Sequence, residues 1–160
     1  MPLFLNLLRH GEAAPTGTGG DAARPLAARG EQTIRKLSQR LARDGWSPDV
    51  VFSSPLRRAR DTALILTRGL GLEPPIVTLT ELKGEAEPES VVAALAARGA
   101  SEGQILLVGH QPQLGLLAGH LTGTVRVLTA GELVRIECPE GALKGTGSLV
   151  LAIRPHEPGG

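Results

Sequence analysis

The chain has 160 residues and a mass of 16.7 kDa, the size of one domain, so we expect a single domain over residues 1–160. Its formal net charge of +1 and aromatic content of 2% argue against a nucleic-acid partner, because the chain has neither a basic field nor stacking platforms. The lone Cys138 cannot form an internal disulfide and is interpreted as a small buried apolar residue in a reducing compartment.

The N-terminus is apolar over residues 1–8 but then reaches Arg9 and His10. This run is too short for a secretory segment or a membrane-spanning helix. We therefore expect a cytoplasmic protein with no membrane partner.

Short apolar runs bounded by turn residues predict buried parallel strands. They occupy residues 3–8, 49–52, 76–79 and 105–108. Two later segments, residues 132–137 and 148–154, alternate between apolar and polar positions and fit edge or antiparallel strands.

Between these strands the apolar residues recur at helical spacing. The predicted helices cover residues 26–43, 56–70, 88–99 and 112–123. Residues 15–20 (PTGTGG) are interpreted as a mobile loop. The alternation of strand and helix predicts an α/β fold, a three-layer α/β/α sandwich with a mostly parallel central sheet.

Polar side chains follow each of the four parallel strands, at the point where the strand ends. In chain order they are Arg9 and His10, Arg57 and Arg58, Glu81, and His110. Because the carboxyl ends of parallel strands meet at the same edge of a sheet, we expect these groups to converge on one ligand site.

The chemistry of this set is that of phosphoryl transfer without a metal or cofactor. Guanidinium groups match phosphate oxygens, and a neutral imidazole is a nucleophile near neutral pH. A second imidazole can donate to the oxygens of five-coordinate phosphorus, and a carboxylic acid can protonate the leaving oxygen. The histidines lack the spacing of a zinc site, and neither a phosphate loop nor a dinucleotide motif is present.

Four motifs in series resemble those of the histidine phosphatase superfamily, which includes the cofactor-dependent phosphoglycerate mutases. They are residues 7–13 (LLRHGEA), 24–30 (RPLAARG), 53–63 (SSPLRRARDTA) and 108–112 (VGHQP). Ala27 stands where the second motif usually has threonine, which removes a helix-capping hydroxyl.

The resemblance implies a phosphoglycerate mutase-like fold and a role for each matching residue. His10 would be the nucleophile that becomes phosphorylated, and Arg9, Arg58 and His110 would complete the phosphate pocket. Gly11 and Arg24 would be further substrate-binding residues, although Arg24 could equally form a salt bridge at the start of a helix.

The general acid is assigned to Glu81, with Glu85 and Glu12 as alternatives. Larger relatives carry this acid after the third strand, where Glu81 is the best match. For a phosphohistidine substrate a strong acid would be dispensable, because imidazole leaves more easily than an alkoxide.

The length resembles that of the smallest members, the SixA-type phosphohistidine phosphatases, and the short spacing between Arg58, Glu81 and His110 leaves no room for a large lid. An open site favours phosphohistidine in a signalling phosphotransfer protein as substrate. The alternative is a phosphomonoesterase or mutase-like enzyme acting on sugar phosphates. A binding module with a degenerate site is a third hypothesis, disfavoured by the intact arginines and histidines.

The remaining polar residues of these types receive ordinary interpretations. Arg57 and Arg60 are expected to be solvated helix arginines, and His120 and His156 to be surface histidines without partners. The oligomeric state does not follow from the sequence.

Overall fold

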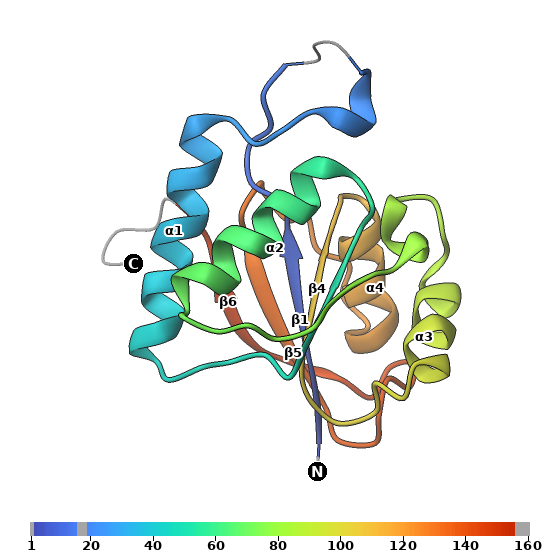
Figure 1. Cartoon of the computed structure of the whole chain (residues 1–160). Coiled ribbons are helices and arrows are strands. Elements are labelled where there is room, and N and C mark those ends of the chain that lie inside the picture. Colours follow the sequence, from blue (N-terminus) through green and yellow to red (C-terminus); the bar gives the residue numbers. More distant parts are fainter. Residues whose placement is uncertain (1, 16–18, 156–160) are drawn as a thin grey trace.

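The computed structural model describes residues 2–15 and 19–155, so His156 and the centre of the predicted loop at residues 15–20 lie outside the described residues. Six strands form one sheet in the order β3-β2-β4-β1-β5-β6 (Figure 1). They are β1 Leu3–Arg9, β2 Val50–Ser53, β3 Ile76–Thr78, β4 Gly103–Gly109, β5 Leu133–Cys138 and β6 Ser148–Ile153. All six predicted strands are confirmed. The first four are parallel to one another, β5 runs antiparallel to β1, and β6 runs antiparallel to β5.

The four predicted helices are also confirmed. They are α1 Ala28–Arg43, α2 Arg57–Gly69, α3 Pro88–Ala97 and α4 Gln113–Thr122. Helix α1 begins after Ala27 without a side-chain cap, as the missing threonine predicts. Two 3₁₀ turns, η1 Asp21–Ala23 and η2 Thr80–Lys83, were not expected, and both lie close to the strand ends that carry the polar residues.

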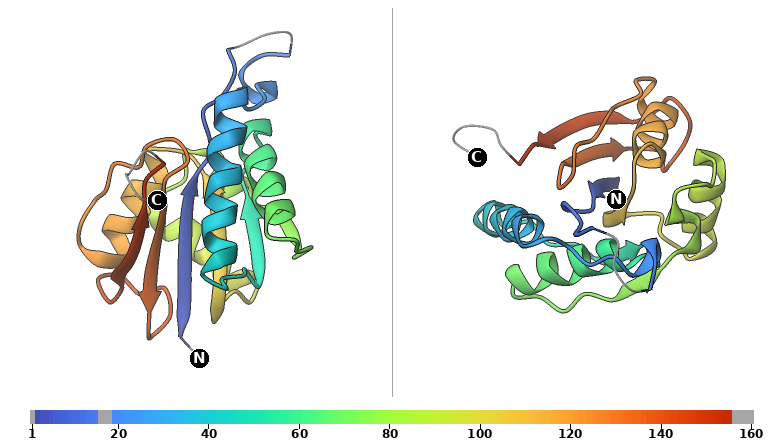
Figure 2. Two further views of the ribbon diagram at one scale, coloured as in Figure 1. Left: turned by 90° about the vertical axis from the view of Figure 1, so that its left-hand side faces the viewer. Right: turned by 90° about the horizontal axis from the view of Figure 1, so that it is seen from above.

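The sheet is covered on both faces, which confirms the three layers. Helices α1 and α2 lie on one side of it, and α3 and α4 on the other (Figure 2). Alternate side chains of β1 enter different layers: Leu7 packs in the cluster that includes α3 and α4, and Leu8 in the cluster with α1 and α2. A strand buried on both faces consists of a continuous run of apolar residues, and this run makes it recognisable in the sequence.

Strands β1 and β4 are neighbours whose following helices lie on opposite faces of the sheet. The register pairs Arg9, the last residue of β1, with Gly109, the last residue of β4. The two chains therefore separate directly after this pair, and such a switch point opens a crevice at the carboxyl ends of the strands. His10 and His110 are the first residues beyond it.

The N-terminus of α1 packs directly against the chain that leaves β1. A Cβ on Gly30 would overlap the carbonyl oxygen of Glu12, and a Cβ on Gly11 would lie 3.0 Å from the carbonyl oxygen of Gly30. The amide of Ala27 donates to the same Glu12 oxygen at 2.9 Å. Glycine at positions 11 and 30 thus permits a backbone contact that fixes the residue after His10.

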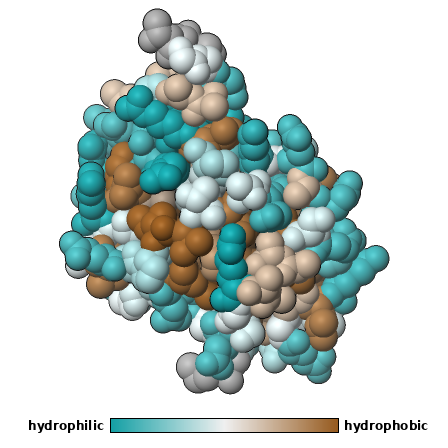
Figure 3. All heavy atoms as spheres, turned by 45° about the vertical axis from the view of Figure 1, so that its right-hand side comes forward, coloured by the Kyte–Doolittle hydropathy of each residue, from teal (hydrophilic) through white to brown (hydrophobic). Residues whose placement is uncertain are grey.

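Most large apolar side chains are buried, and so is the cysteine. Cys138 is fully buried, as predicted, and burial raises the pKa of its thiol to about 11. Figure 3 shows one face, where brown apolar side chains reach the surface in a patch surrounded by polar ones. In residues 2–15 and 19–155 no helix is both long enough and apolar enough to cross a membrane.

We predict that Gly30→Ala lowers the free energy of unfolding by about 1–3 kcal/mol, because the added methyl group forces Glu12 away from α1. Urea unfolding followed by circular dichroism measures this change. Gly109→Ala is the control: its Cβ would lie 3.6 Å from Leu114 and from the Leu82 carbonyl oxygen, an ordinary contact, and stability should change by less than about 1 kcal/mol. A Gly30→Ala protein as stable as the wild type would contradict the close packing.

Candidate active site

A polar cavity of about 590 Å³ lies at the carboxyl ends of β1 and β4. Its lining residues come from the segments that follow several strands of the sheet. They are Arg9, His10, Glu12, Ala13, Arg24, Arg58, Lys83, Gly84, Glu85, His110, Gln111 and Ala130. The structure therefore brings together both predicted histidines and the three arginines proposed to bind phosphate.

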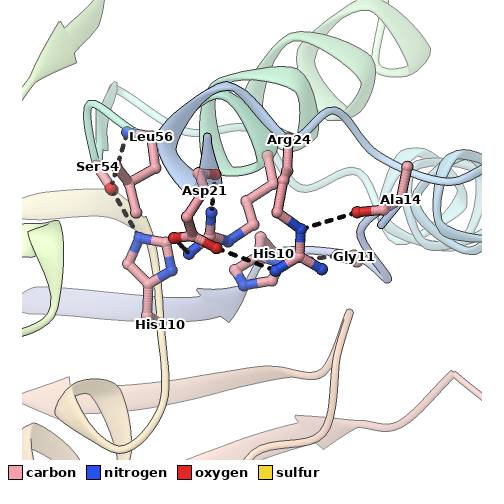
Figure 4. A network of polar contacts seen from close by, with 9 residues as sticks. His10, Gly11, Ala14, Asp21, Arg24, Ser54, Leu56 and His110 are labelled. Atoms are coloured by element: carbon pink, nitrogen blue, oxygen red, sulfur yellow. Dashed lines mark hydrogen bonds and ion pairs between the residues drawn. The ribbon is translucent and has the colours of Figure 1, made fainter. Parts of the chain in front are cut away.

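His10 is held by the backbone of its neighbour. Its side chain is buried, and Nδ1 lies 2.7 Å from the carbonyl oxygen of Gly11 (Figure 4). A carbonyl oxygen can only accept, so Nδ1 carries the hydrogen and Nε2 keeps its lone pair. Burial, reinforced by the positive charges of Arg58 and Arg9, lowers the pKa of His10 to about 4. The ring is neutral at physiological pH, as a nucleophile must be.

His110 faces His10, with the two ring centroids 5.1 Å apart. Its Nε2 lies 2.8 Å from Oγ of Ser54, and that oxygen also accepts a hydrogen bond from the amide of Leu56 (Figure 4). Oγ can donate its hydrogen to Nε2 or accept one from it, so this contact holds the ring in place with either tautomer. Burial, followed by the charges of the other site residues, lowers the pKa of His110 to about 4.

The arginines are anchored by backbone oxygens and keep other donors unused. Arg9 donates from Nη1 to the carbonyl oxygen of Leu128 at 2.9 Å. Its Nε is buried and has no hydrogen-bond partner among the described residues. Arg58 is nearly covered, with 12% of its side chain exposed, and lies in the first turn of α2, where backbone amides also favour an anion. The unused donors suit the oxygens of a phosphoryl group.

Glu81 is not among the residues that line this cavity, whereas Glu12 and Glu85 are. Glu81 follows β3, the edge strand, and β2 separates β3 from β4. The chain enters the cavity lining only at Lys83, the last residue of η2, although the Glu81 carbonyl oxygen accepts a hydrogen bond from Nε2 of Gln113 on α4. The Glu81 carboxylate instead accepts a hydrogen bond from the Thr80 hydroxyl.

Three of the predictions for single residues can be compared with the structure. Arg57 is exposed and pairs with Asp61, and Arg60 is exposed as well, both as expected. The expectation for His120 is wrong: its side chain is only 10% exposed and Nδ1 lies 3.6 Å from the Glu89 carboxylate. It lies on α4, outside the cavity lining.

Several residues next to the cavity were missed from the sequence. Asp21 contacts both Arg24 and Arg58, and Ser54 contacts His110. The buried carboxylate of Glu132 accepts from the amide and hydroxyl of Thr129 and so shapes the turn below Arg9. Ser54 could have been found from its place directly after β2. Asp21 and Glu132 follow no strand of the parallel set, and the Arg58 partner of Asp21 is 37 positions away in the chain.

Within the part of the chain that the structure describes, no group of three or more His, Cys, Asp or Glu side chains is arranged to hold a metal ion.

Comparisons with known proteins agree with the arrangement of these motifs. The family model of the histidine phosphatase superfamily (branch 1) matches residues 5–84. An uncharacterised protein of Picosynechococcus sp. is 38% identical over 117 residues, which are 69% of this chain and 68% of that protein. The chain belongs to the histidine phosphatase superfamily. A phosphatase is therefore the class of enzyme that its family indicates.

Solved structures of this family share the fold along nearly the whole chain. The protein histidine phosphatase SixA complexed with tungstate is 25% identical, with a TM-score of 0.84 and coverage of 96% of this chain and 97% of that one. The alpha-ribazole phosphatase of Shigella flexneri is 23% identical, with a TM-score of 0.75 and coverage of 96% and 97%. A mycobacterial glucosyl-3-phosphoglycerate phosphatase is 17% identical, with a TM-score of 0.69 and coverage of 94% and 98%. The phosphoglycerate mutase-like fold is confirmed.

The two buried imidazoles predict how the stability of this histidine phosphatase depends on pH. Both have a pKa of about 4 in the folded chain against 6.5 for a free histidine, so between these values the unfolded state binds more protons. The free energy of unfolding should therefore be largest above about pH 6.5 and should fall as the pH drops towards 4. Urea unfolding at pH 7 and pH 5 measures this loss.

His10→Gln should show a smaller loss of stability between pH 7 and pH 5 than the wild type, because one of the two imidazoles is gone. His120→Gln, which removes an imidazole outside the cavity lining, should keep the full loss. Equal losses in the wild type and His10→Gln would contradict the lowered pKa of His10 as a cause of the pH dependence.

Proposed function

We propose that this chain is a phosphatase that works through a phosphohistidine intermediate on His10 and acts on phosphohistidine in a phosphotransfer protein. The observation that carries the proposal is the pair of neutral, buried imidazoles facing each other in one cavity with Arg9, Arg24 and Arg58. The arginines supply charge for the phosphoryl oxygens, and His10 supplies the nucleophile.

In the first step the lone pair on Nε2 of His10 attacks phosphorus. A bond forms between Nε2 and phosphorus while the bond from phosphorus to the leaving nitrogen or oxygen breaks, and the leaving group keeps that electron pair. The hydrogen bond from Nδ1 to the Gly11 oxygen supports the positive charge that develops on the ring. His110 and the arginines stabilise the charge on the equatorial oxygens.

In the second step water attacks the phosphohistidine. A bond forms between the water oxygen and phosphorus while the bond from Nε2 to phosphorus breaks, and that electron pair returns to Nε2 of His10. The proton that water gives up passes to a phosphoryl oxygen, and inorganic phosphate leaves. The two steps need no reactant other than the chain, the substrate and water. Gly11 contributes through its carbonyl oxygen, and its amide is fixed by the hydroxyl of Thr62 at 3.1 Å.

A protein substrate is supported by what surrounds the cavity. The stretch from Leu70 to Pro88 holds only the short strand β3 and the turn η2, so no domain-sized cap folds over the site from this side. Val125 and Val127 are 61% and 79% exposed, on the same loop as Leu128, which anchors Arg9. Exposed apolar side chains on a loop that holds a residue of the cavity suit contact with another protein.

A small phosphate ester is the second candidate substrate. The match with this chain covers 97% of an alpha-ribazole phosphatase and 98% of a glucosyl-3-phosphoglycerate phosphatase. Chain length therefore does not separate enzymes that act on small phosphate esters from those that act on phosphoproteins. Rates on a panel of phosphomonoesters and on a phosphohistidine protein distinguish them directly.

Replacing the nucleophile tests the mechanism. His10→Ala should lower turnover of p-nitrophenyl phosphate by about 10⁴-fold or more, because no covalent intermediate can form. His120→Gln, a histidine outside the cavity lining, should keep wild-type turnover. An acid-labile phosphate trapped on His10 by rapid quenching, found by mass spectrometry in the wild type, is the direct readout. Wild-type turnover in His10→Ala would refute the mechanism.

The carboxylates in the cavity predict a difference between substrates. Glu85 lines the cavity, and Glu12 does so while engaged with Arg29 at 3.5 Å. Glu85→Gln should slow an alkyl phosphate by about 10²-fold or more, because its leaving oxygen must be protonated. The same variant should barely slow a phosphohistidine protein or p-nitrophenyl phosphate, whose leaving groups depart with little help.

Glu81→Gln is the matched comparison, since this carboxylate is not among the lining residues of the cavity. It should leave all three rates unchanged. Equal and large losses on all three substrates for Glu81→Gln would instead restore Glu81 as the general acid and favour a sugar phosphate as substrate.

A further inference from the structure

Asp21 joins two arginines of the cavity. Its Oδ1 accepts from Nη1 of Arg24 at 3.1 Å, and its Oδ2 accepts from Nη2 of Arg58 at 3.3 Å (Figure 4). The carbonyl oxygen of Asp21 accepts from Nη1 of Arg58 at 3.1 Å as well. One residue thus takes donors from two guanidinium groups that reach it from different parts of the chain.

The carboxylate lies outside the cavity. Arg24 and Arg58 are lining residues, and Asp21 is not. Its side chain is 63% exposed, whereas those of Arg24 and Arg58 are 28% and 12% exposed. Arg24 and Arg58 thus each contact Asp21 and line the cavity, and each guanidinium has donors that Asp21 does not take.

The position of Asp21 is itself fixed by the backbone around it. The turn η1 closes with the amide of Arg24 donating to the Asp21 carbonyl oxygen at 3.2 Å, and Nε of Arg24 donates to the Ala14 carbonyl oxygen at 2.8 Å. The hydrogen bond from Arg24, together with the charge of Arg58, lowers the pKa of the Asp21 carboxyl, so it stays ionised.

We infer that Asp21 is a positioning residue: it bridges Arg24 and Arg58 from outside the cavity and sets the spacing of the two guanidinium groups that bind the phosphoryl oxygens. The inference rests on the proposed function for the identity of the ligand. A guanidinium that is already oriented loses less conformational entropy when phosphate binds, which strengthens binding.

In the opposite role, the Asp21 carboxylate would compete with phosphate for the arginines. Its removal would then strengthen anion binding instead of weakening it. A competitor has to occupy the place of the phosphate, and Asp21 is not in the cavity lining. Charge alone also favours tighter anion binding once a nearby carboxylate is neutralised. Weaker binding after its removal can therefore come only from lost positioning.

Tungstate binding by isothermal titration calorimetry tests this without turnover. Asp21→Asn should weaken tungstate binding about tenfold, the order seen when residues that orient a ligand-binding group are removed. Asp61→Asn is the control, because Asp61 pairs with Arg57, next to Arg58, and does not line the cavity. It removes the same charge from α2 and should leave binding unchanged within about twofold. Unchanged or tighter binding in Asp21→Asn overturns the inference.

A second measurement asks whether Asp21 acts through the arginines. In an Arg24→Ala background, Asp21→Asn should weaken tungstate binding clearly less than it does in the wild type, because one arm of the bridge is already absent. Equal effects in both backgrounds overturn the inference, since a general structural role would be additive. Wild-type protein that binds tungstate but hydrolyses no phosphorylated substrate would refute the proposed function alone.

Discussion

The parallel pairing of β1 with β4 is the constraint on which the site depends. The register sets Arg9 beside Gly109, and the amide of His10 donates to the Gly109 carbonyl oxygen at 3.1 Å. His10 and His110 are thereby placed side by side by hydrogen bonds of the sheet rather than by contacts between their own rings. A register shift of one residue would turn alternate side chains of the strand to the other face and separate the two imidazoles.

Burial and charge act on these imidazoles in the same direction. Burial is the larger cause of their lowered pKa, and the neighbouring arginines add to it. The arginines therefore have two roles under the proposed function: they help to keep His10 neutral, and they attract the phosphoryl group. When that anion binds, its charge offsets theirs, which raises the pKa of His110 and favours its protonated, hydrogen-donating form. The arriving ligand thus strengthens its own hydrogen bond to His110.

The sequence was enough for the elements and for the polar residues that follow the parallel strands, because both are local patterns. Doubly buried strands are continuous apolar runs, and the polar residues that end them stand out. The order of the strands is not local: β4 inserts between β2 and β1, which leaves β3 at the edge. Glu81 was expected in a cavity whose lining the chain enters only two residues later, at Lys83. Asp21 was missed because Arg58, its partner, is 37 positions away in the chain.

The three arginines share one mode of attachment. Each donates to a backbone carbonyl oxygen: Arg9 to Leu128, Arg24 to Ala14, and Arg58 to Asp21. These oxygens lie in two segments outside the regular elements, one before α1 and one between α4 and β5. The second is held against α4 at Gly115, where a Cβ would overlap the Arg126 carbonyl oxygen. The strands thus fix the nucleophile and the loops fix the phosphate-binding charges, so loop changes can alter anion binding while the imidazole pair stays in place.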